Sequence, residues 1–214
     1  KPIKRIESFH SYKGGASGGT LETMFSMGEL DLGEDLTDPF LLNPADSYSD
    51  EQKQLSSDRV GIAKKREINA WSGPFIMATA NTRVVRRTEA LLALRQESYG
   101  ADFTYQEHAY HKSWFSAARS LILTGISVLV LLSPLKKLVK PFLPKPGEGP
   151  SESVQENGWF DCKYIVETDD GIKSVFNMNG KGDPGYKVTS KLVSECALCL
   201  IENEDSLPGG KENG

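Results

Sequence analysis

A strand-like alternation in the last third of the chain constrains its fold more than any other feature. Apolar or aromatic residues occupy every second position there, with mostly polar residues between them, namely Phe160, Cys162, Tyr164 and Val166. Such alternation is typical of a strand with one buried face. Asp170-Gly171 is a pair favoured in type I′ hairpin turns, and Ile172–Met178 is the expected return strand. The sequence therefore predicts a sheet that contains antiparallel strands.

Other segments predict the elements that surround this hairpin. Strands are expected at 3–12 and 103–109, and helices at 21–29, 76–95 and 186–201. Thr20 is expected to cap the first of these helices. Together the elements predict an α+β fold with a mixed, largely antiparallel sheet and helices on one face.

The remaining segments suggest how the chain is organised. Residues 1–112 are expected to form the first part of the domain, with a surface excursion at 31–69 and a turn at 71–75. Residues 113–150 form a hydrophobic insert and a Pro/Gly linker, and residues 151–214 supply the hairpin and the last helix of the same domain. Because neither end shows a closing element, we expect both ends to be cuts in a longer protein.

Composition narrows the classes of function. The 214 residues carry a formal net charge of -4, with 38% hydrophobic and 25% charged residues, which fits ordinary globular usage. No broad basic face is implied, so we expect no nucleic-acid partner. The three cysteines favour a reducing compartment over a secreted disulfide framework.

Two pairs of metal-binding or redox-type residues have a plainer interpretation. Cys196 and Cys199 have the CxxC spacing, but they fall inside a predicted helix and not at its start, where thiolates are stabilised. We therefore expect buried structural thiols. His108 and His111 come without further ligands, so we predict no metal site.

An uncharged run at 120–135 is rich in Leu, Ile and Val. Its 16 residues are fewer than the roughly 20 that a spanning helix needs. Trp114 and Phe115 precede the run, and Lys136, Lys137 and Lys140 follow it. Two interpretations stay open: the segment 114–140 contacts a membrane or lipid surface, or it forms a buried core helix.

A glycine-rich loop joins the first predicted strand to the first predicted helix. It contains Gly14, Gly15, Ser17, Gly18 and Gly19 and leads into Thr20. The loop has no Gly-x-Gly-x-x-Gly register and no lysine before Thr20, so it matches neither the dinucleotide nor the phosphate-loop fingerprint. Its amides could still meet an anionic group at the helix start. A ligand contact and a tight structural turn both remain open.

A basic cluster near Asn81 is the second candidate site. Arg83 and Arg87 are four residues apart and share one helix face, with Arg86 beside them. Guanidinium groups bind carboxylate or phosphate through two parallel hydrogen bonds, so the cluster predicts an anion site. A solvated helix face is the alternative.

Three stretches, taken in order, carry a family resemblance. They are Gly14–Thr20, Gly73–Ala78 continuing to Asn81–Arg87, and Gly182–Tyr186 followed by the helix through Leu200. This ordered set resembles the saccharopine-dehydrogenase-like oxidoreductases, which include trans-acting enoyl reductases and lipid-droplet-associated relatives.

The resemblance implies a two-domain protein in which a Rossmann domain outside this chain binds NAD or NADP. This chain would be the substrate-side, non-Rossmann domain, inactive alone, of an oxidoreductase that transfers hydride to a lipid-like enoyl substrate in lipid or glycolipid metabolism. The last helix would then expose apolar surface that meets the other domain. The substrate- or cofactor-facing residues are expected to be Gly14, Gly15, Ser17, Gly18, Gly19, Thr20, Asn81 and Arg83, with the catalytic residues unassigned.

A non-catalytic protein with the same fold is the alternative function. It would act at a membrane surface or lipid droplet through residues 114–140. We expect a cytosol-facing membrane surface or a lipid droplet as the location, with the cytoplasm as the alternative, and a homodimer stays open.

Overall fold

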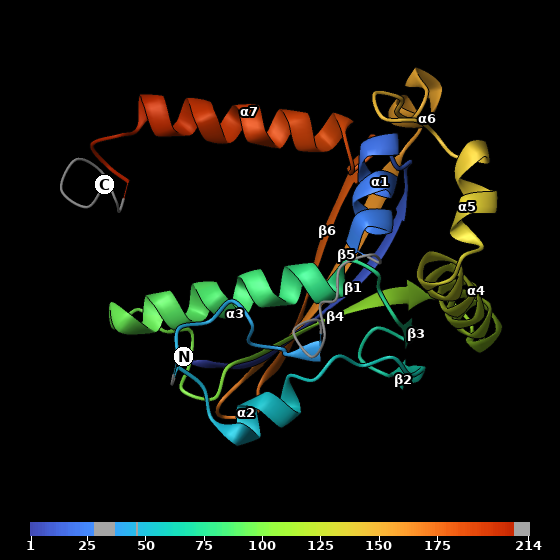
Figure 1. Cartoon of the computed structure of the whole chain (residues 1–214). Coiled ribbons are helices and arrows are strands. Elements are labelled where there is room, and N and C mark those ends of the chain that lie inside the picture. The colour runs from blue at the N-terminus through green and yellow to red at the C-terminus, as the bar shows by residue number, and fades with distance from the viewer. Residues whose placement is uncertain (28–36, 46, 208–214) are drawn as a thin grey trace.

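The fold is built on one six-stranded sheet. The computed structural model describes residues 1–27, 37–45 and 47–207 (Figure 1). The strands are β1 (Ile3–Lys13), β2 (Ala63–Lys65), β3 (Ala70–Gly73), β4 (Thr104–His111), β5 (Trp159–Thr168) and β6 (Lys173–Lys181), in the order β2-β3-β4-β1-β5-β6. Only β1 and β4 pair in parallel, and the other neighbours are antiparallel. The predicted α+β class with a mixed, largely antiparallel sheet is confirmed.

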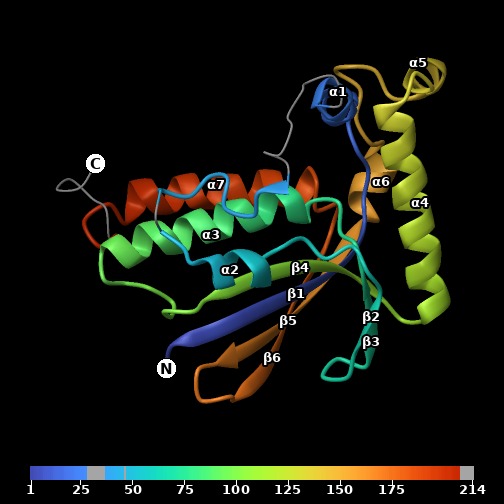
Figure 2. The same ribbon diagram turned by 60° about the horizontal axis from the view of Figure 1, so that its bottom comes forward.

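The helices differ in how closely they join the sheet. They are α1 (Gly18–Met27), α2 (Asp50–Leu55), α3 (Ala78–Leu94), α4 (Trp114–Leu132), α5 (Lys136–Val139), α6 (Glu152–Glu156) and α7 (Lys187–Glu202), with a 3-10 helix η2 (Lys140–Phe142). Helices α3 and α7 lie over the same face of the sheet (Figure 2). Helix α4 stands at one end of the molecule, beside β2 and β3 (Figure 2). The helices expected at 76–95 and 186–201 are thereby confirmed as α3 and α7.

Strand β1 holds the sheet together. It pairs with β4 from Arg5↔Thr104 to His10↔Ala109 and with β5 along most of its length. Phe9 is fully buried on β1, and its ring stacks on His108 of β4 with 5.1 Å between the ring centroids. Residues on both sides of the 113–150 segment therefore share one sheet.

The hairpin between β5 and β6 is confirmed, but its predicted turn type is wrong. A type I′ turn needs a positive φ at both central residues. Gly171 has φ 80°, whereas Asp170 is not among the described residues with positive φ. The Gly171 amide donates to the Thr168 carbonyl at 2.9 Å, and the Thr168 amide donates to the Ile172 carbonyl at 3.0 Å. The loop is thus one residue longer than predicted, with glycine at the left-handed position.

Helix starts account for two corrections. Thr20 does not cap α1, because the helix begins at Gly18 and the Thr20 amide donates to the Ser17 hydroxyl at 3.2 Å. The predicted end of this helix at Glu29 lies outside the described residues. The excursion at 31–69 contains a helix, α2, which a capping box between Ser49 and Gln52 stabilises.

Short strands account for the next correction. Residues 63–65 form β2 within the segment expected to be surface, and the predicted turn at 71–75 overlaps β3. Strand β2 pairs with β3, and β3 pairs with β4, so these neighbours supply the backbone hydrogen bonds that the local sequence did not signal. Three- and four-residue strands are too short for a period-two pattern to be visible.

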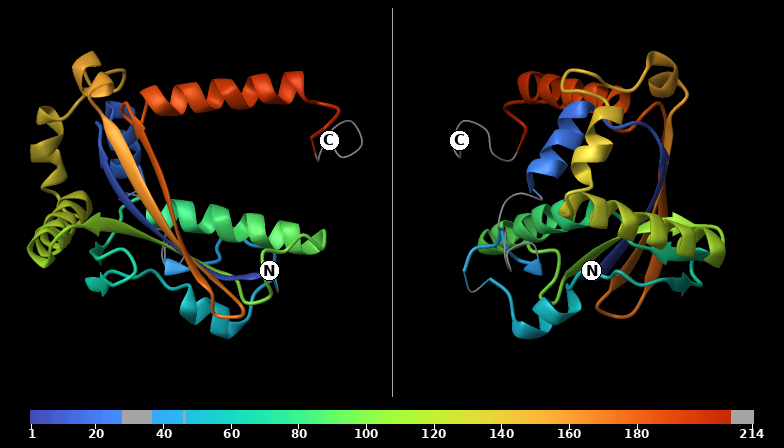
Figure 3. Two further views of the ribbon diagram at one scale, coloured as in Figure 1. Left: turned by 180° about the vertical axis from the view of Figure 1, so that it is seen from behind. Right: turned by 45° about the vertical axis from the view of Figure 1, so that its right-hand side comes forward.

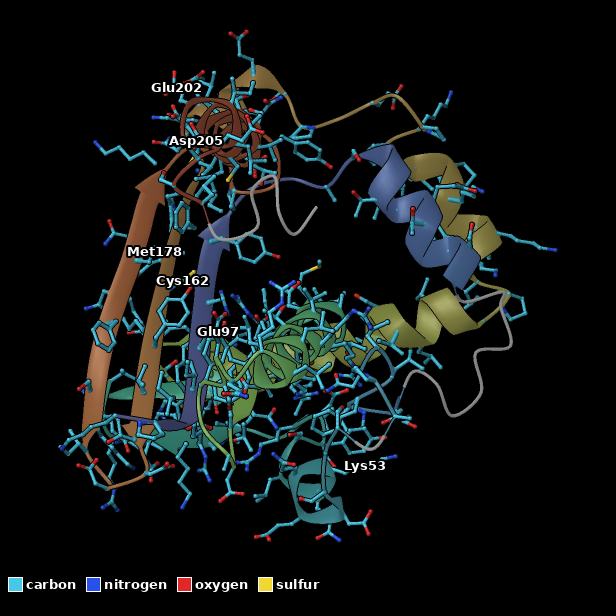
Figure 4. All side chains as sticks on the ribbon, turned by 90° about the vertical axis from the view of Figure 1, so that its left-hand side faces the viewer. Lys53, Glu97, Cys162, Met178, Glu202 and Asp205 are labelled. Atoms are coloured by element: carbon cyan, nitrogen blue, oxygen red, sulfur yellow. The ribbon has the colours of Figure 1, made fainter. Side chains whose placement is uncertain are left out.

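Helix α7 exposes its apolar side chains, as predicted. Leu200 and Ile201 are 64% and 76% exposed, and no residue of the helix is buried. The prediction of buried thiols on this helix is therefore wrong, because Cys196 and Cys199 are both exposed. Cys162 is buried on β5, opposite Met178 of β6 (Figure 4).

These positions predict a two-to-one split in thiol reactivity. In the native chain, an aromatic disulfide reagent should react rapidly with Cys196 and Cys199 and slowly with Cys162. Burial raises the pKa of the Cys162 thiol, which also lowers its thiolate fraction. Peptide mapping of the labelled protein checks the order, and rapid labelling of all three cysteines would contradict it.

Candidate functional site

The glycine loop between β1 and α1 is packed against two other segments. A side chain at Gly14 would collide with the Asp183 carboxylate, and one at Gly18 would collide with the Lys145 carbonyl oxygen. At Gly15 a Cβ would lie 2.6 Å from Pro150. These glycines are thus required by close contact within the protein.

Two amides of this loop already have partners within the protein. The Gly18 amide donates to the Glu148 carbonyl at 2.9 Å, and the Ser17 amide donates to the Tyr186 hydroxyl at 2.7 Å. The hydrogen bond from Ser17 lowers the pKa of Tyr186. The loop therefore fastens the end of β1 to the start of α7, and its Gly18 and Ser17 amides are not free for a phosphate. A ligand contact at Ser17 or Thr20 through their side chains stays a prediction.

The arginine cluster on α3 is held by the protein itself. Arg83 is buried and binds Asp58 through two hydrogen bonds of 2.6 and 2.8 Å. Arg86, also buried, donates to the carbonyls of Pro39 and Tyr105 at 2.9 Å each. Burial lowers the pKa of Arg86 to about 10, so it keeps its charge at neutral pH. The predicted fork to an anion exists at Arg83, and the anion is the Asp58 side chain.

Asn81 leads to a buried polar network that sequence reasoning missed. Its amide donates to Oε2 of Glu107 at 2.9 Å, and the Tyr105 hydroxyl donates to Oε1 of the same carboxylate at 2.8 Å. The Tyr105 hydroxyl lies 3.3 Å from the Ser8 hydroxyl, which lies 2.9 Å from Nε2 of His10. We call the set Ser8, His10, Asn81, Tyr105 and Glu107 the polar relay.

Burial sets the protonation of the polar relay. It raises the pKa of Glu107 and, with the nearby Glu107 charge, that of Tyr105. Burial, followed by the charge of His108, lowers the pKa of His10 to about 4, so the imidazole is neutral at pH 7. Nδ1 of His10 lies 3.2 Å from the Cys162 thiol. The hydroxyls of Tyr105 and Ser8 and the neutral imidazole of His10 thus form a continuous hydrogen-bonded chain that begins at the Glu107 carboxyl group.

A second buried group lies on the opposite face of β1. Lys65 donates to Glu7 at 2.6 Å, and Nε2 of His108 lies 3.5 Å from the same carboxylate oxygen. Burial alone would raise the pKa of Glu7, but the bonds from His108 and Lys65 outweigh it and hold the pKa at about 2. This group stabilises the fold and faces away from the polar relay, because Glu7 and Ser8 are neighbours on one strand.

The polar relay reaches an open cavity of about 430 Å³ at the end of β1 and β4. Aromatic and apolar side chains of Tyr12, Phe75 and Leu123 line part of it, and His10 lies at its edge. Helix α4 forms one wall, with Arg119 as the charged group. The imidazole of His10 stacks on Phe75 with 4.6 Å between the ring centroids. The lining thus combines apolar and aromatic surface with hydroxyl and imidazole groups that could orient a small molecule.

The structure does not bring all the predicted site residues together in one site. Asn81 belongs to the polar relay, whereas the glycine loop bonds to Tyr186 and Glu148, and Arg83 bonds to Asp58. The sequence did carry a signal for the relay, since the polar residues Ser8 and Glu107 and the hydroxyl-bearing Tyr105 fall within segments predicted as strands. Within the described ranges, no group of three or more His, Cys, Asp or Glu residues could hold a metal ion.

Comparison with known proteins adds independent information. A protein of Mycobacterium tuberculosis (strain ATCC 25618 / H37Rv), provisionally named a trans-acting enoyl reductase, is 35% identical over 92% of this chain and 50% of its own length. Trans-acting enoyl reductases of Mycobacterium leprae (strain TN) and Mycobacterium bovis (strain BCG / Pasteur 1173P2) are 30% and 31% identical, each over 64% of this chain and 34% of their own length. The chain therefore spans about half the length of the first relative.

These matches support the enoyl reductase part of the resemblance drawn from the three sequence stretches. No family model matches the chain, and no solved structure matches it. The saccharopine-dehydrogenase-like part of the resemblance stays a prediction.

The glycine loop gives a matched pair of stability predictions. Gly18→Ala should destabilise the chain by roughly 2 kcal/mol, because the new methyl group meets the backbone at Lys145 and Pro144. Gly125→Ala, in α4, meets nothing within 4 Å and should stabilise the chain by up to about 1 kcal/mol. Urea unfolding measures both, and equal effects of the two substitutions would contradict the close-contact argument.

The two buried groups give separate acid transitions. His10 has a folded pKa of about 4 and an ordinary value of 6.5, so its stability contribution is complete above pH 6.5 and is lost as the pH falls toward 4. The loss over this window should be on the order of a few kcal/mol. His10→Asn should flatten the pH dependence of the free energy of unfolding in that window.

Glu7→Gln is the control for this measurement. The Glu7 contribution is complete above pH 4.5 and is lost toward pH 2. The substitution should therefore leave the slope between pH 6.5 and 4.5 unchanged. Urea unfolding at a series of pH values tests both, and an unchanged slope in His10→Asn would overturn the assignment.

Proposed function

We propose that this chain is the substrate-side part of an NAD(P)-dependent enoyl reductase that acts on a lipid-like enoyl substrate. The cavity carries the proposal, because one charged guanidinium stands there among aromatic and apolar side chains next to the polar relay. The similarity to a provisionally named trans-acting enoyl reductase over 92% of the chain, and to further trans-acting enoyl reductases over 64%, supports the same chemistry.

Two amides of the glycine loop, those of Ser17 and Gly18, donate within the protein and are not free for a nucleotide phosphate. We infer that the dinucleotide is bound mainly by residues outside this chain. When bound, a reduced nicotinamide supplies the hydride that adds to the β-carbon of the enoyl group.

The residues of this chain would act on the other half of the substrate. Tyr12, Phe75 and Leu123 give the acyl chain an apolar surface, and Arg119 can donate to the carbonyl oxygen, where negative charge develops during hydride addition. The α-carbon then needs one proton. Water in the open cavity can supply that proton, because both ring nitrogens of His10 already lie within hydrogen-bond distance of Ser8 and Cys162. The neutral His10 imidazole avoids placing a second cation beside Arg119.

The test measures nicotinamide oxidation with an enoyl thioester, in this chain alone and in the longest natural polypeptide that contains it. Activity is expected in the longer form only, and Arg119→Gln should lower kcat/KM there by roughly 100-fold. Arg59→Gln, which removes an exposed arginine outside the cavity, is the matched control and should keep full activity. Loss of activity in both variants, or in neither, would contradict the role of Arg119.

A second candidate is a non-catalytic protein with the same fold at a lipid surface. The outward apolar side chains of α4 favour it. Calorimetry separates the two functions: if neither form of the protein binds NADH or NADPH, the oxidoreductase proposal fails and this candidate replaces it.

A further inference from the structure

Helix α4 turns its apolar residues away from the protein. Phe115, Ile122 and Leu129 are 79%, 62% and 64% exposed. They are seven residues apart, which is nearly two helical turns, so they form one stripe along the helix, joined by Ile126. We call Phe115, Ile122, Ile126 and Leu129 the apolar stripe.

Another face of α4 is mainly polar and faces the cavity. It carries Ser116, Ser120, Thr124 and Ser127, with Leu123 beside them. Arg119 also lines the cavity, but it is four residues after Phe115 and three before Ile122, so it lies at the edge of the apolar stripe. A helix of a soluble domain normally buries its apolar stripe and exposes its polar face. In α4 the two faces are reversed, so the expectation of a buried core helix at 120–135 is wrong for this stripe.

Exposed apolar side chains continue past α4 into α5 and η2, and basic side chains lie among them. Leu138 of α5 and Phe142 of η2 are 69% and 88% exposed. Residues 112–147 contain six basic side chains and no acidic one, in a chain whose net charge is -4. One of the six, Lys140, pairs with Glu22 at 2.8 Å, and both partners stay about half exposed.

An anionic lipid surface offers negative charge and an apolar interior, which match the basic and the apolar side chains of this region. Lysine ammonium groups bind lipid phosphates, and apolar side chains enter the boundary of the acyl chains. Trp114, half exposed beside Phe115, is an aromatic residue of the kind enriched at that boundary. Among the described residues no helix is long and apolar enough to cross a membrane, so α4 would lie along the surface.

We propose that the apolar stripe of α4, with Leu138, Phe142 and the lysines of 136–145, docks this protein on an anionic lipid bilayer. Figure 3 shows α4 and α5 together on one side of the molecule, apart from α7. Since the same helix walls the cavity, docking brings the cavity to the lipid surface, and a lipid-like molecule reaches it along α4. The docking is independent of the proposed reaction.

The exposed apolar face of α7 is different in charge. Residues 187–202 contain two lysines and two glutamates, so their formal charges cancel. An anionic surface would thus select α4 over α7, although both helices expose Leu, Ile and Val. This difference makes α7 the internal control.

Vesicle flotation tests the proposal. The chain should float with phosphatidylcholine vesicles that contain phosphatidylglycerol and stay unbound with phosphatidylcholine alone, and the Trp114 emission should shift to the blue. The triple variant Ile122→Ser, Ile126→Ser, Leu129→Ser should lower the bound fraction at least roughly tenfold. Lys137→Glu with Lys145→Glu should do the same.

The α7 triple variant Leu192→Ser, Val193→Ser, Ile201→Ser should bind as the unsubstituted chain does. All replaced side chains of α4 and α7 are exposed, so unchanged thermal unfolding is expected and verifies folding. Equal loss of binding in the α7 variant, or no binding to anionic vesicles, overturns the proposal. A dimer in light scattering that the α4 variant converts to a monomer would assign the stripe to a second copy instead.

Discussion

The structure depends on how the polar side chains of β1 are satisfied once that strand is buried on both sides. Ser8 is fully buried and Glu7 nearly so, and an unpaired buried hydroxyl or carboxylate would cost several kcal/mol. On one face Glu7 fixes Lys65 of β2 and His108 of β4. On the other face Ser8 fixes His10 and Tyr105. The strand order around β1 is therefore specified by hydrogen-bond partners as well as by apolar packing.

Buried arginines form hydrogen bonds of the same kind between helix α3 and the loops. The segment around 38–58 buries Phe40, and Arg83 and Arg86 of α3 also hold it through Asp58 and the Pro39 carbonyl. Both guanidinium groups are nearly inaccessible, so removing one partner would leave a buried charge or buried acceptors unpaired. On the same helix, the Asn81 side-chain amide donates to Glu107. Helix α3 therefore contacts both the 38–58 segment and the polar relay.

The elements with long periodic patterns could be predicted from sequence, and those fixed by distant partners could not. The β5–β6 hairpin, α3 and α7 follow from local periodicity. By contrast, β3 is strand because β4 lies beside it, and Cys196 is exposed because the described chain offers α7 no packing surface. The glycine loop was correctly located, but only its contacts with Pro150, Asp183 and Tyr186 show that it closes on the protein. The polar relay needed the pairing of β1 with β4, which joins residues about a hundred positions apart.

The reversed polarity of α4 connects the cavity to the outer surface. The serine and threonine hydroxyls on its cavity face can bond to backbone carbonyls of the helix, as Ser127 does to Leu123, or to water. Larger apolar side chains in their place would narrow the cavity. The polar inner face therefore keeps the cavity open, and the apolar residues are left for the outer face. A helix with this division fits a boundary between a polar protein cavity and an apolar medium. The polar and apolar residues of 114–132 are therefore arranged for a helix with a cavity on one side and an apolar medium on the other. A helix that packed on a single buried core would have its apolar residues on the inner face.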